Sequence, residues 1–153
     1  WPPVVDDQLT IFPFDYCGIY NRTKFMDTNG FDEKMENPYW QKMDFGFRSF
    51  LWGEKIRLSR DIRFRYVTEI PAEDTTPDMA YKLFYLKNIF VRHGRSGGYL
   101  PLRHLFHYLF DSDSGPLVSL KEFGAVRRWI DENRHRFRTD SRHLISNWEV
   151  PAT

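Results

Sequence analysis

The segment from Asn29 to Gly53, NGFDEKMENPYWQKMDFGFRSFLWG, constrains the fold more than any other part of the chain. Asn29-Gly30 favours a tight turn, because both residue types tolerate positive φ. Asn37-Pro38 predicts a helix N-cap followed by proline at the first helical position. Gly53 has the place of the glycine that follows a helix end. The segment therefore predicts a turn that leads into a helix with a defined beginning and end.

The apolar residues of this helix are expected to face the core. Met43, Phe47 and Leu51 recur at four-residue steps, and Trp40 and Phe50 widen the stripe. This spacing places them on one side of a helix, as in the amphipathic helices of globular proteins. We predict that this side packs inward.

A second face of the same helix is polar. Gln41, Asp44 and Arg48 follow the spacing i, i+3 and i+7, which brings an amide, a carboxylate and a guanidinium together. We predict that this face lines a cleft. A simpler interpretation is an ion pair between Asp44 and Arg48 on a helix surface, which stabilises a helix by about 0.3 to 0.5 kcal/mol.

These pieces resemble the acceptor-binding half of inverting family-2 glycosyltransferases of the GT-A fold. In that family a Gly-Gly-Phe-Asp-Glu-like turn precedes a helix with a Glu-Asp-x-Asp-Leu-x-x-Arg-like pattern, which a glycine closes before the next strand. Residues 29–33 resemble the turn, residues 44–48 the second half of the helix pattern, and residues 53–56 its exit. The resemblance covers roughly residues 9–68. Further on, Lys87-Asn88 resembles an Arg/Lys-Asn pair that similar enzymes carry on a later helix.

The resemblance implies that the parent protein transfers a sugar from a nucleotide-sugar to a hydroxyl of a sugar or lipid-linked acceptor. Asp44 would then be the catalytic residue that orients or activates this hydroxyl. The implied substrate-binding residues are Asp32, Glu33, Trp40, Gln41, Lys42 and Arg48. Mg or Mn would serve the parent protein, whereas no metal site or cofactor is expected within these residues.

The chain departs from the family where the acidic pair is expected. Gln41-Lys42 occupies the place of the Glu-Asp pair, one member of which is the general base of the family. An amide cannot take a proton at neutral pH, and a lysine acts as a base only where its pKa is strongly lowered. An alternative hypothesis is therefore a carbohydrate- or protein-binding module without transferase chemistry.

The expected fold is α/β, a fragment of a GT-A fold with a small mixed sheet and C-terminal helices. Strands are predicted within residues 9–20 and 55–68, the latter because apolar residues occupy even positions from Ile56 to Tyr66. Residues 1–75 would form the acceptor-side part, and residues 76–153 a helical extension packed on it as one structural unit. The donor-binding half is absent from these residues, so we expect no sugar transfer by them alone.

Three features of the second half predict further elements. Thr76-Pro77-Asp78 predicts a helix start, with Thr76 as the cap. Residues 93–98 are expected to form a flexible loop. Ser119-Leu120-Lys121-Glu122 has the pattern of a capping box and predicts that a long helix begins at Ser119.

Composition and charge restrict the partners and the location. The net charge of +1 indicates no general affinity for nucleic acid. A single cysteine, Cys17, excludes an internal disulfide and a Cys-rich zinc site. No apolar run is long enough to span a bilayer, so we expect a cytoplasmic protein.

One amphipathic segment suggests a peripheral contact with the inner membrane face. The predicted helix over residues 100–110 carries Arg103, His104 and His107 on its polar side, where they could meet anionic lipid headgroups. Because so few charges are involved, the interpretation that we favour is that this helix packs onto the helix that begins at Met79.

Overall fold

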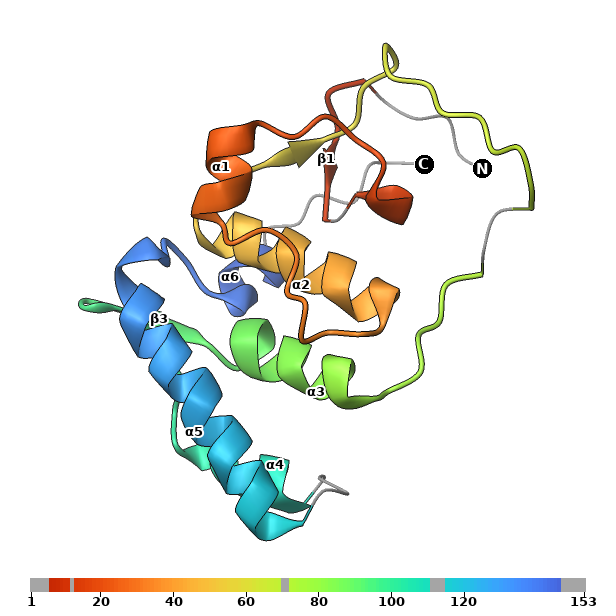
Figure 1. Cartoon of the computed structure of the whole chain (residues 1–153). Helices are drawn as coiled ribbons and strands as arrows, with labels where there is room; N and C mark the ends of the chain where they lie inside the picture. The colour runs from red at the N-terminus through yellow and green to blue at the C-terminus, as the bar shows by residue number, and fades with distance from the viewer. Residues whose placement is uncertain (1–5, 12, 70–71, 111–114, 147–153) are drawn as a thin grey trace.

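The computed structural model describes residues 6–11, 13–69, 72–110 and 115–146 (Figure 1). In chain order, the elements of these residues are β1 (Leu9–Thr10), the 3₁₀-helix η1 (Phe14–Tyr16), α1 (Arg22–Asp27), α2 (Pro38–Leu51), β2 (Ile56–Arg57), α3 (Met79–Phe84), the π-helix η2 (Tyr85–Ile89), β3 (Arg92–Gly94), β4 (Gly97–Tyr99), α4 (Arg103–Phe110), α5 (Pro116–Asn133), the 3₁₀-helix η3 (Arg134–Arg136) and α6 (Ser141–Ser146).

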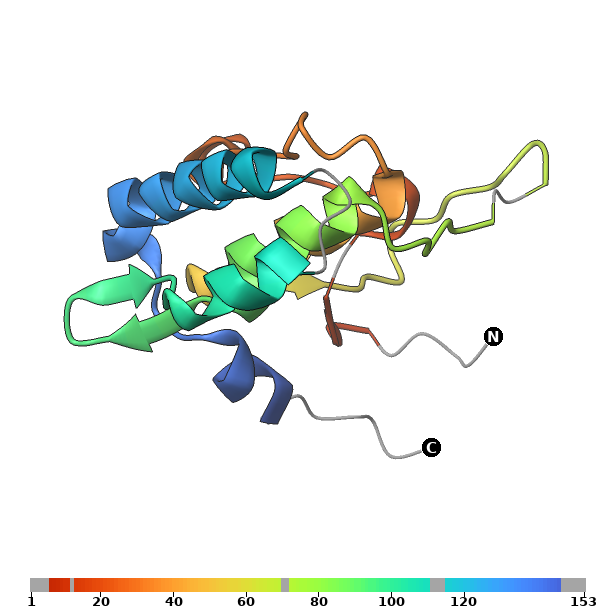
Figure 2. The same cartoon turned by 90° about the horizontal axis from the view of Figure 1, so that it is seen from below.

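Helices α2 and α3 form the centre of the molecule, where they lie side by side and run in the same direction (Figure 1). The long helix α5 packs against α4, η2 and the β3–β4 hairpin. Viewed from below, α5 and α6 lie on opposite sides of α3 (Figure 2). The central helix pair is therefore covered from several directions.

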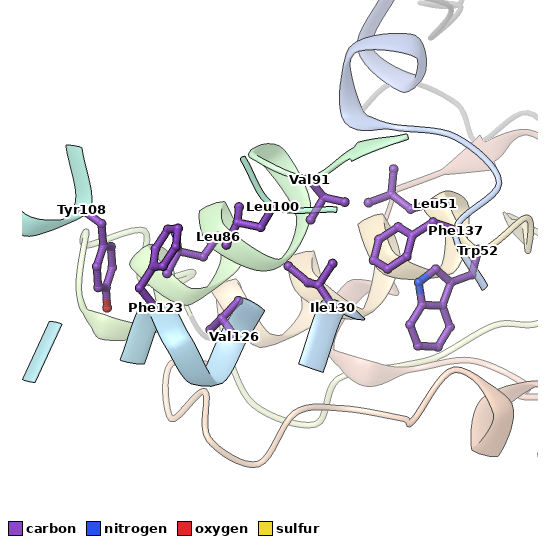
Figure 3. Close-up of a cluster of buried hydrophobic side chains, with 10 residues drawn as sticks. All are labelled: Leu51, Trp52, Leu86, Val91, Leu100, Tyr108, Phe123, Val126, Ile130 and Phe137. Atoms are coloured by element: carbon purple, nitrogen blue, oxygen red, sulfur yellow. The ribbon is translucent and has the colours of Figure 1, made fainter. Parts of the chain in front are cut away.

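Two clusters of buried apolar side chains hold these helices together. The larger cluster joins the end of α2 to η2, α4, α5 and the segment after η3 (Figure 3), and consists of Leu51, Trp52, Leu86, Val91, Leu100, Tyr108, Phe123, Val126, Ile130 and Phe137. The smaller cluster joins α2 to α3 and consists of Met35, Phe47, Ala80 and Phe84. Residues from before and after position 75 share both clusters.

The predicted boundaries of α2 are confirmed. The side chain of Asn37 accepts hydrogen bonds from the backbone N–H groups of Tyr39 and Trp40, at 3.0 and 3.4 Å, and Pro38 is the first helical residue. Gly53 has a φ of 92° just beyond the end of the helix. These local signals act within a few residues, which is why the sequence alone reveals them.

Removing the α2 cap gives the first prediction. Asn37→Ala should lower the free energy of unfolding by about 1 kcal/mol, because it leaves N–H groups of the first turn without an acceptor. Urea titration followed by circular dichroism measures this difference. Asn21→Ala, which removes the cap of the short exposed helix α1, is the matched control and should cost less. A larger loss for Asn21→Ala would contradict the central place of α2.

The prediction of a chain that mixes helices with small sheets is confirmed, but the single mixed sheet is wrong. The structure has two separate two-stranded sheets, and both are antiparallel. Strands β1 and β2 do pair, but over two residues each. Asp15 and Tyr16 have φ values of 46° and 58°, so the aromatic-rich segment turns where an extended strand was expected.

Other predicted elements are corrected at their ends. Asp78 caps α3 in place of Thr76, because its side chain accepts the N–H of Tyr81 at 3.0 Å. Helix α5 begins at Pro116, three residues before Ser119, whose hydroxyl instead donates to the carbonyl of Gly115 at 3.0 Å. Residues 93–98 form most of the β3–β4 hairpin and not a flexible loop.

Candidate functional site

Arg48 connects the turn before α2 to the helix itself. Its Nη2 donates to the carbonyl of Gly30 at 2.7 Å, and its Nη1 donates to the carbonyl of Thr28. The turn has the left-handed backbone expected of it, with φ values of 60° at Asn29 and 54° at Gly30. Since the guanidinium is 1% exposed, these hydrogen bonds form inside the protein, where they bind the turn firmly to α2.

Asp44 lies beneath this turn and is completely buried. Its Oδ2 accepts hydrogen bonds from Arg48 Nη2 at 2.7 Å and Nε at 3.2 Å. Its Oδ1 accepts one from Asn88 Nδ2 at 2.8 Å and lies 3.9 Å from Lys87 Nζ. Both carboxylate oxygens are thus occupied by groups of the protein.

These contacts make Asp44 a weak base. Burial by itself would raise the pKa of Asp44, but the positive charges of Arg48 and Lys87 and the hydrogen bonds from Asn88 and Arg48 lower the pKa below its ordinary value. A general base must also reach the proton it removes. The prediction that Asp44 faces an open cleft is therefore wrong for this structure, because residues 28–32 and η2 cover that face of α2.

The two residues at the place of the acidic pair are also occupied. Gln41 Oε1 accepts from the hydroxyl of Tyr16 at 2.7 Å, and Gln41 Nε2 donates to the carbonyl of Asp32 at 2.9 Å. Lys42 is 2% exposed and forms an ion pair with Glu73 at 2.6 Å. Both side chains connect α2 to neighbouring segments.

Trp40 contributes to packing between α2 and α3. Its ring lies 4.8 Å from the ring of Tyr81 and 5.6 Å from that of Phe84. Its Nε1 donates to the carbonyl of Thr76 at 2.9 Å. Trp40 therefore belongs to the contact between the two central helices, and a substrate contact by its ring face is not supported.

Asp32 and Glu33 do line an open groove, which we call the Asp32 groove. It has a volume of about 630 Å³ and is lined by Asn29, Phe31, Asp32, Glu33, Lys34, Arg48, Met79, Leu83, Lys87, Glu122, Ala125, Val126 and Trp129. The segment before α2 and helix α5, which form its walls, lie on the same side of α3 (Figure 2). Its size falls within the range of small-ligand sites, which is about 300 to 1,000 Å³.

Charged pairs occupy the floor of the Asp32 groove. Asp32 Oδ2 pairs with Lys87 Nζ at 2.7 Å, and this ammonium lies 4.2 Å from the ring centroid of Trp129. The ring of Trp129 is stacked on that of Trp52, with 5.9 Å between centroids. Lys87 thus joins the groove to the buried carboxylate of Asp44 beneath it.

The structure adds residues that the helix pattern did not indicate. Glu122 and Trp129 enter the Asp32 groove from α5, a long surface helix on which such side chains usually face solvent. Their spacing in the sequence does not distinguish Glu122 and Trp129 from the other residues of α5. Lys87 and Asn88 did have a signal, because the pair was noted in the resemblance, and the π-helix η2 buries both against the turn and α2.

The described residues were compared with two further kinds of feature, a metal-binding cluster and a membrane-spanning helix, and they contain neither. In this part of the chain, no group of three or more His, Cys, Asp or Glu side chains is arranged to hold a metal ion. Among the helices that the structure describes, none combines the length and the apolar character needed to cross a bilayer.

Comparison with known proteins gave no match: no family model, no curated protein and no solved structure is similar enough to this chain to be paired with it. The function of the chain is therefore inferred from the site itself.

Proposed function

We propose that this chain is the acceptor-binding part of a GT-A-like glycosyltransferase and that its Asp32 groove holds a hydroxyl-rich acceptor, a sugar or the sugar of a lipid-linked acceptor. The observation that supports this proposal most directly is the arrangement of the turn. Arg48 fastens residues 28–30 to α2, and the acids that follow, Asp32 and Glu33, line the groove. The two motifs that carry the resemblance are thereby parts of one structural unit.

The composition of the groove suits a carbohydrate. Glu33 offers carboxylate oxygens that accept hydrogen bonds from hydroxyl groups, and Lys34 offers an ammonium donor. Asp32 and Glu122 also line the groove, and each already accepts a hydrogen bond, from Lys87 and from the hydroxyl of Tyr108. Met79, Leu83 and Val126 provide apolar surface for the C–H faces of a sugar ring. A mostly apolar wall with a few polar groups that fix orientation is typical of small-ligand sites.

Within this proposal the buried charges position the groove and do not react. Asp44 pairs with Arg48, and Lys87, which lies near Asp44, pairs with Asp32 at the groove floor. A base for the acceptor hydroxyl must then be a groove carboxylate or belong to another part of the parent protein. The donor nucleotide and its Mg or Mn would bind outside these residues.

A second candidate is a carbohydrate-binding module without transferase chemistry. The ion pair between Lys42 and Glu73 favours it, because the position of the usual base carries a buried cation that is already paired. This candidate shares the Asp32 groove with the first. The two differ in whether a longer polypeptide with a donor-binding half transfers sugar.

Saccharide binding to the 153-residue chain tests the groove. We expect chemical-shift changes in ¹H–¹⁵N NMR spectra at groove residues when mono- and disaccharides are added. Glu33→Gln should weaken binding about tenfold, because it replaces a charge-assisted hydrogen bond with a neutral one. The matched control is Glu36→Gln, which changes an exposed glutamate three residues away that does not line the groove.

Two outcomes separate the alternatives. Turnover of a nucleotide-sugar by a polypeptide extended at its N-terminus, reduced by Glu33→Gln and not by Glu36→Gln, supports the glycosyltransferase. Saccharide binding without turnover supports the module. Equal weakening by both substitutions, or no saccharide binding at any concentration tested, would remove the groove from the proposal.

A further inference from the structure

Helix α4 exposes aromatic side chains on its outer face. Phe106 and Phe110 are 65% and 86% exposed, and Leu102 just before the helix is 55% exposed. The inner face of the same helix is buried through His104 and Tyr108. The predicted packing toward the helix at Met79 is found there, because the hydroxyl of Tyr108 lies 3.8 Å from the sulfur of Met79. The outer face has no such partner in the described residues.

The exposed apolar surface continues onto the neighbouring helix. Helix α5 packs against α4 and exposes Leu117, Val118 and Leu120 in its first turns. This corner of the molecule lies at the opposite end from β1 (Figure 1). Single exposed apolar residues need no explanation, but several on two adjoining helices mark an interaction surface.

Positive charge occupies the same outer face of α4. Arg103, Phe106, His107 and Phe110 follow the spacing i, i+3, i+4 and i+7, so two cationic or titratable side chains alternate with two phenylalanines on one face. Both Arg103 and His107 are exposed. An amphipathic helix with Phe on its apolar part and basic residues beside it is the usual form of a helix that lies in a membrane surface.

More arginine lies directly beside α4. The ring of His104 is stacked on that of Phe90 at 4.2 Å, two residues before Arg92. Ser141 Oγ donates to the carbonyl of Ile89 at 2.8 Å, which brings the adjacent Arg142 to the same region. Arg92, Arg103 and Arg142 form no ion pair within the part of the chain that the structure describes.

The effect of this charge is visible at two groups. Burial and the nearby charge of Arg142 lower the pKa of Arg92, against the opposing influence of Asp140. Burial and the charges of Arg103, Arg92, His107 and Arg142 lower the pKa of His104. At these two groups the arginines therefore act in the same direction as burial, and an anionic partner beside them would be attracted.

We propose that the outer face of α4, with the beginning of α5 beside it, docks on an anionic lipid bilayer. Phe106 and Phe110 insert between the lipid headgroups, and Arg103 contacts the lipid phosphates. Arg92 and Arg142, which lie near the buried His104, add positive charge behind this face. This surface is separate from the Asp32 groove, since no residue of α4 lines the groove. Apolar insertion together with basic side chains distinguishes a bilayer from a soluble phosphate, which would need the cations alone.

Vesicle binding tests the proposal with the full chain. We expect co-sedimentation with vesicles of phosphatidylcholine and phosphatidylglycerol at low ionic strength, and weaker binding in high salt, where the charges are screened. Phe106→Ser with Phe110→Ser should lower the partition coefficient at least about tenfold, because one inserted phenylalanine contributes that much. Arg103→Gln should lower it about fivefold.

The control variants change the same residue types elsewhere on the surface. Phe64 and Ile19 are 56% and 82% exposed and lie far along the chain from α4, so Phe64→Ser with Ile19→Ser should leave binding unchanged. Arg63→Gln, at another exposed arginine, is the control for Arg103→Gln. All these side chains are exposed, and circular dichroism checks that each variant is folded.

Four results would overturn the proposal. The first is no binding to the anionic vesicles at low salt. The second is equal loss of binding in the α4 variants and their controls. The third is a dimer in sedimentation experiments that disappears in Phe106→Ser with Phe110→Ser while no variant binds lipid, which would assign the face to a second copy of the chain. Binding to inorganic phosphate without binding to vesicles would likewise exclude a bilayer as the partner.

Discussion

Asp44→Asn is expected to lower the free energy of unfolding by about 3 to 5 kcal/mol at pH 7, because it breaks a buried ion pair from one side. The substitution keeps the shape of the side chain but removes the charge that compensates Arg48 and Lys87. Arg48 is buried and cannot turn to solvent without releasing the carbonyls of Thr28 and Gly30. Urea denaturation at neutral pH measures the loss.

Acidification should affect the stability of the wild-type protein and that of Asp44→Asn differently. The pKa of Asp44 is lowered in the folded state, so its contribution to stability is present above the pKa of the unfolded chain, about 3.9, and is lost as the pH falls toward the folded value. Below about pH 4, therefore, the difference in stability between the wild-type protein and Asp44→Asn should shrink. The same urea titrations at several pH values follow this difference.

Asp27→Asn provides the matched comparison, since Asp27 is an exposed aspartate at the end of α1. It should change stability by less than about 0.5 kcal/mol. If Asp44→Asn changed the free energy of unfolding as little as Asp27→Asn, Asp44 would have to be accessible to solvent. It would then again be a candidate for the catalytic base. A loss of sugar transfer in Asp44→Asn would indicate catalysis only if the variant were shown to be folded.

Gly97→Ala is the second substitution with a large expected effect. Gly97 has a φ of 102°, and a methyl group there would lie 2.2 Å from the carbonyl oxygen of Arg134. Left-handed backbone costs a non-glycine residue about 1 to 2 kcal/mol, and a side chain without space costs about 1 to 3 kcal/mol more. We therefore expect a loss of about 2 to 5 kcal/mol in the free energy of unfolding, measured by urea titration.

Gly115→Ala separates the two contributions to this loss. Gly115 also has a positive φ, 80°, but nothing lies within 4 Å of an added methyl group. It should cost only the backbone part, about 1 to 3 kcal/mol, because its ψ of 153° places it in a region that essentially only glycine adopts, less what the alanine saves by restricting the unfolded chain. Equal losses at both positions would mean that the β3–β4 hairpin does not pack closely on η3.

The hairpin shows why some elements escape prediction from sequence. Its loop, Arg95-Ser96, is followed by Gly97-Gly98, a composition typical of a flexible segment, and its strands are three residues each. What orders it is contact with distant residues: Gly98 lies against the ring of Phe137, and Gly97 against the backbone of Arg134. Contacts across some forty positions leave no periodic pattern in the sequence.

The strand predicted within residues 9–20 is confirmed only at Leu9–Thr10, for a related reason. Aromatic and β-branched residues between Leu9 and Tyr20 have high strand propensity, but this propensity mainly reflects packing on a sheet surface. In the structure Tyr16, Tyr20, Phe25, Phe31 and Phe45 instead form a cluster of ring contacts with centroid distances of 4.7 to 6.1 Å. These aromatic rings pack against one another between segments of the chain and do not lie on the face of a strand.

The sequence alone was sufficient to locate the turn at Asn29-Gly30 and both ends of α2. Each depends on neighbours within a few residues: a side-chain cap, a proline with a fixed φ, or a glycine with a free one. It also placed Gln41, Asp44 and Arg48 on one face, because helix geometry is regular.

Tertiary structure decided whether that face is open. A polar helix face looks the same in sequence whether water or protein covers it, since amides, carboxylates and guanidinium groups bind either one. Here the carbonyls of the turn, Asn88 and Lys87 supply the hydrogen bonds and charges that solvent would otherwise provide for Asp44 and Arg48. The open surface lies instead at Asp32 and Glu33. Their segment and α5 leave a space between them, and only the packing of distant helices creates this space.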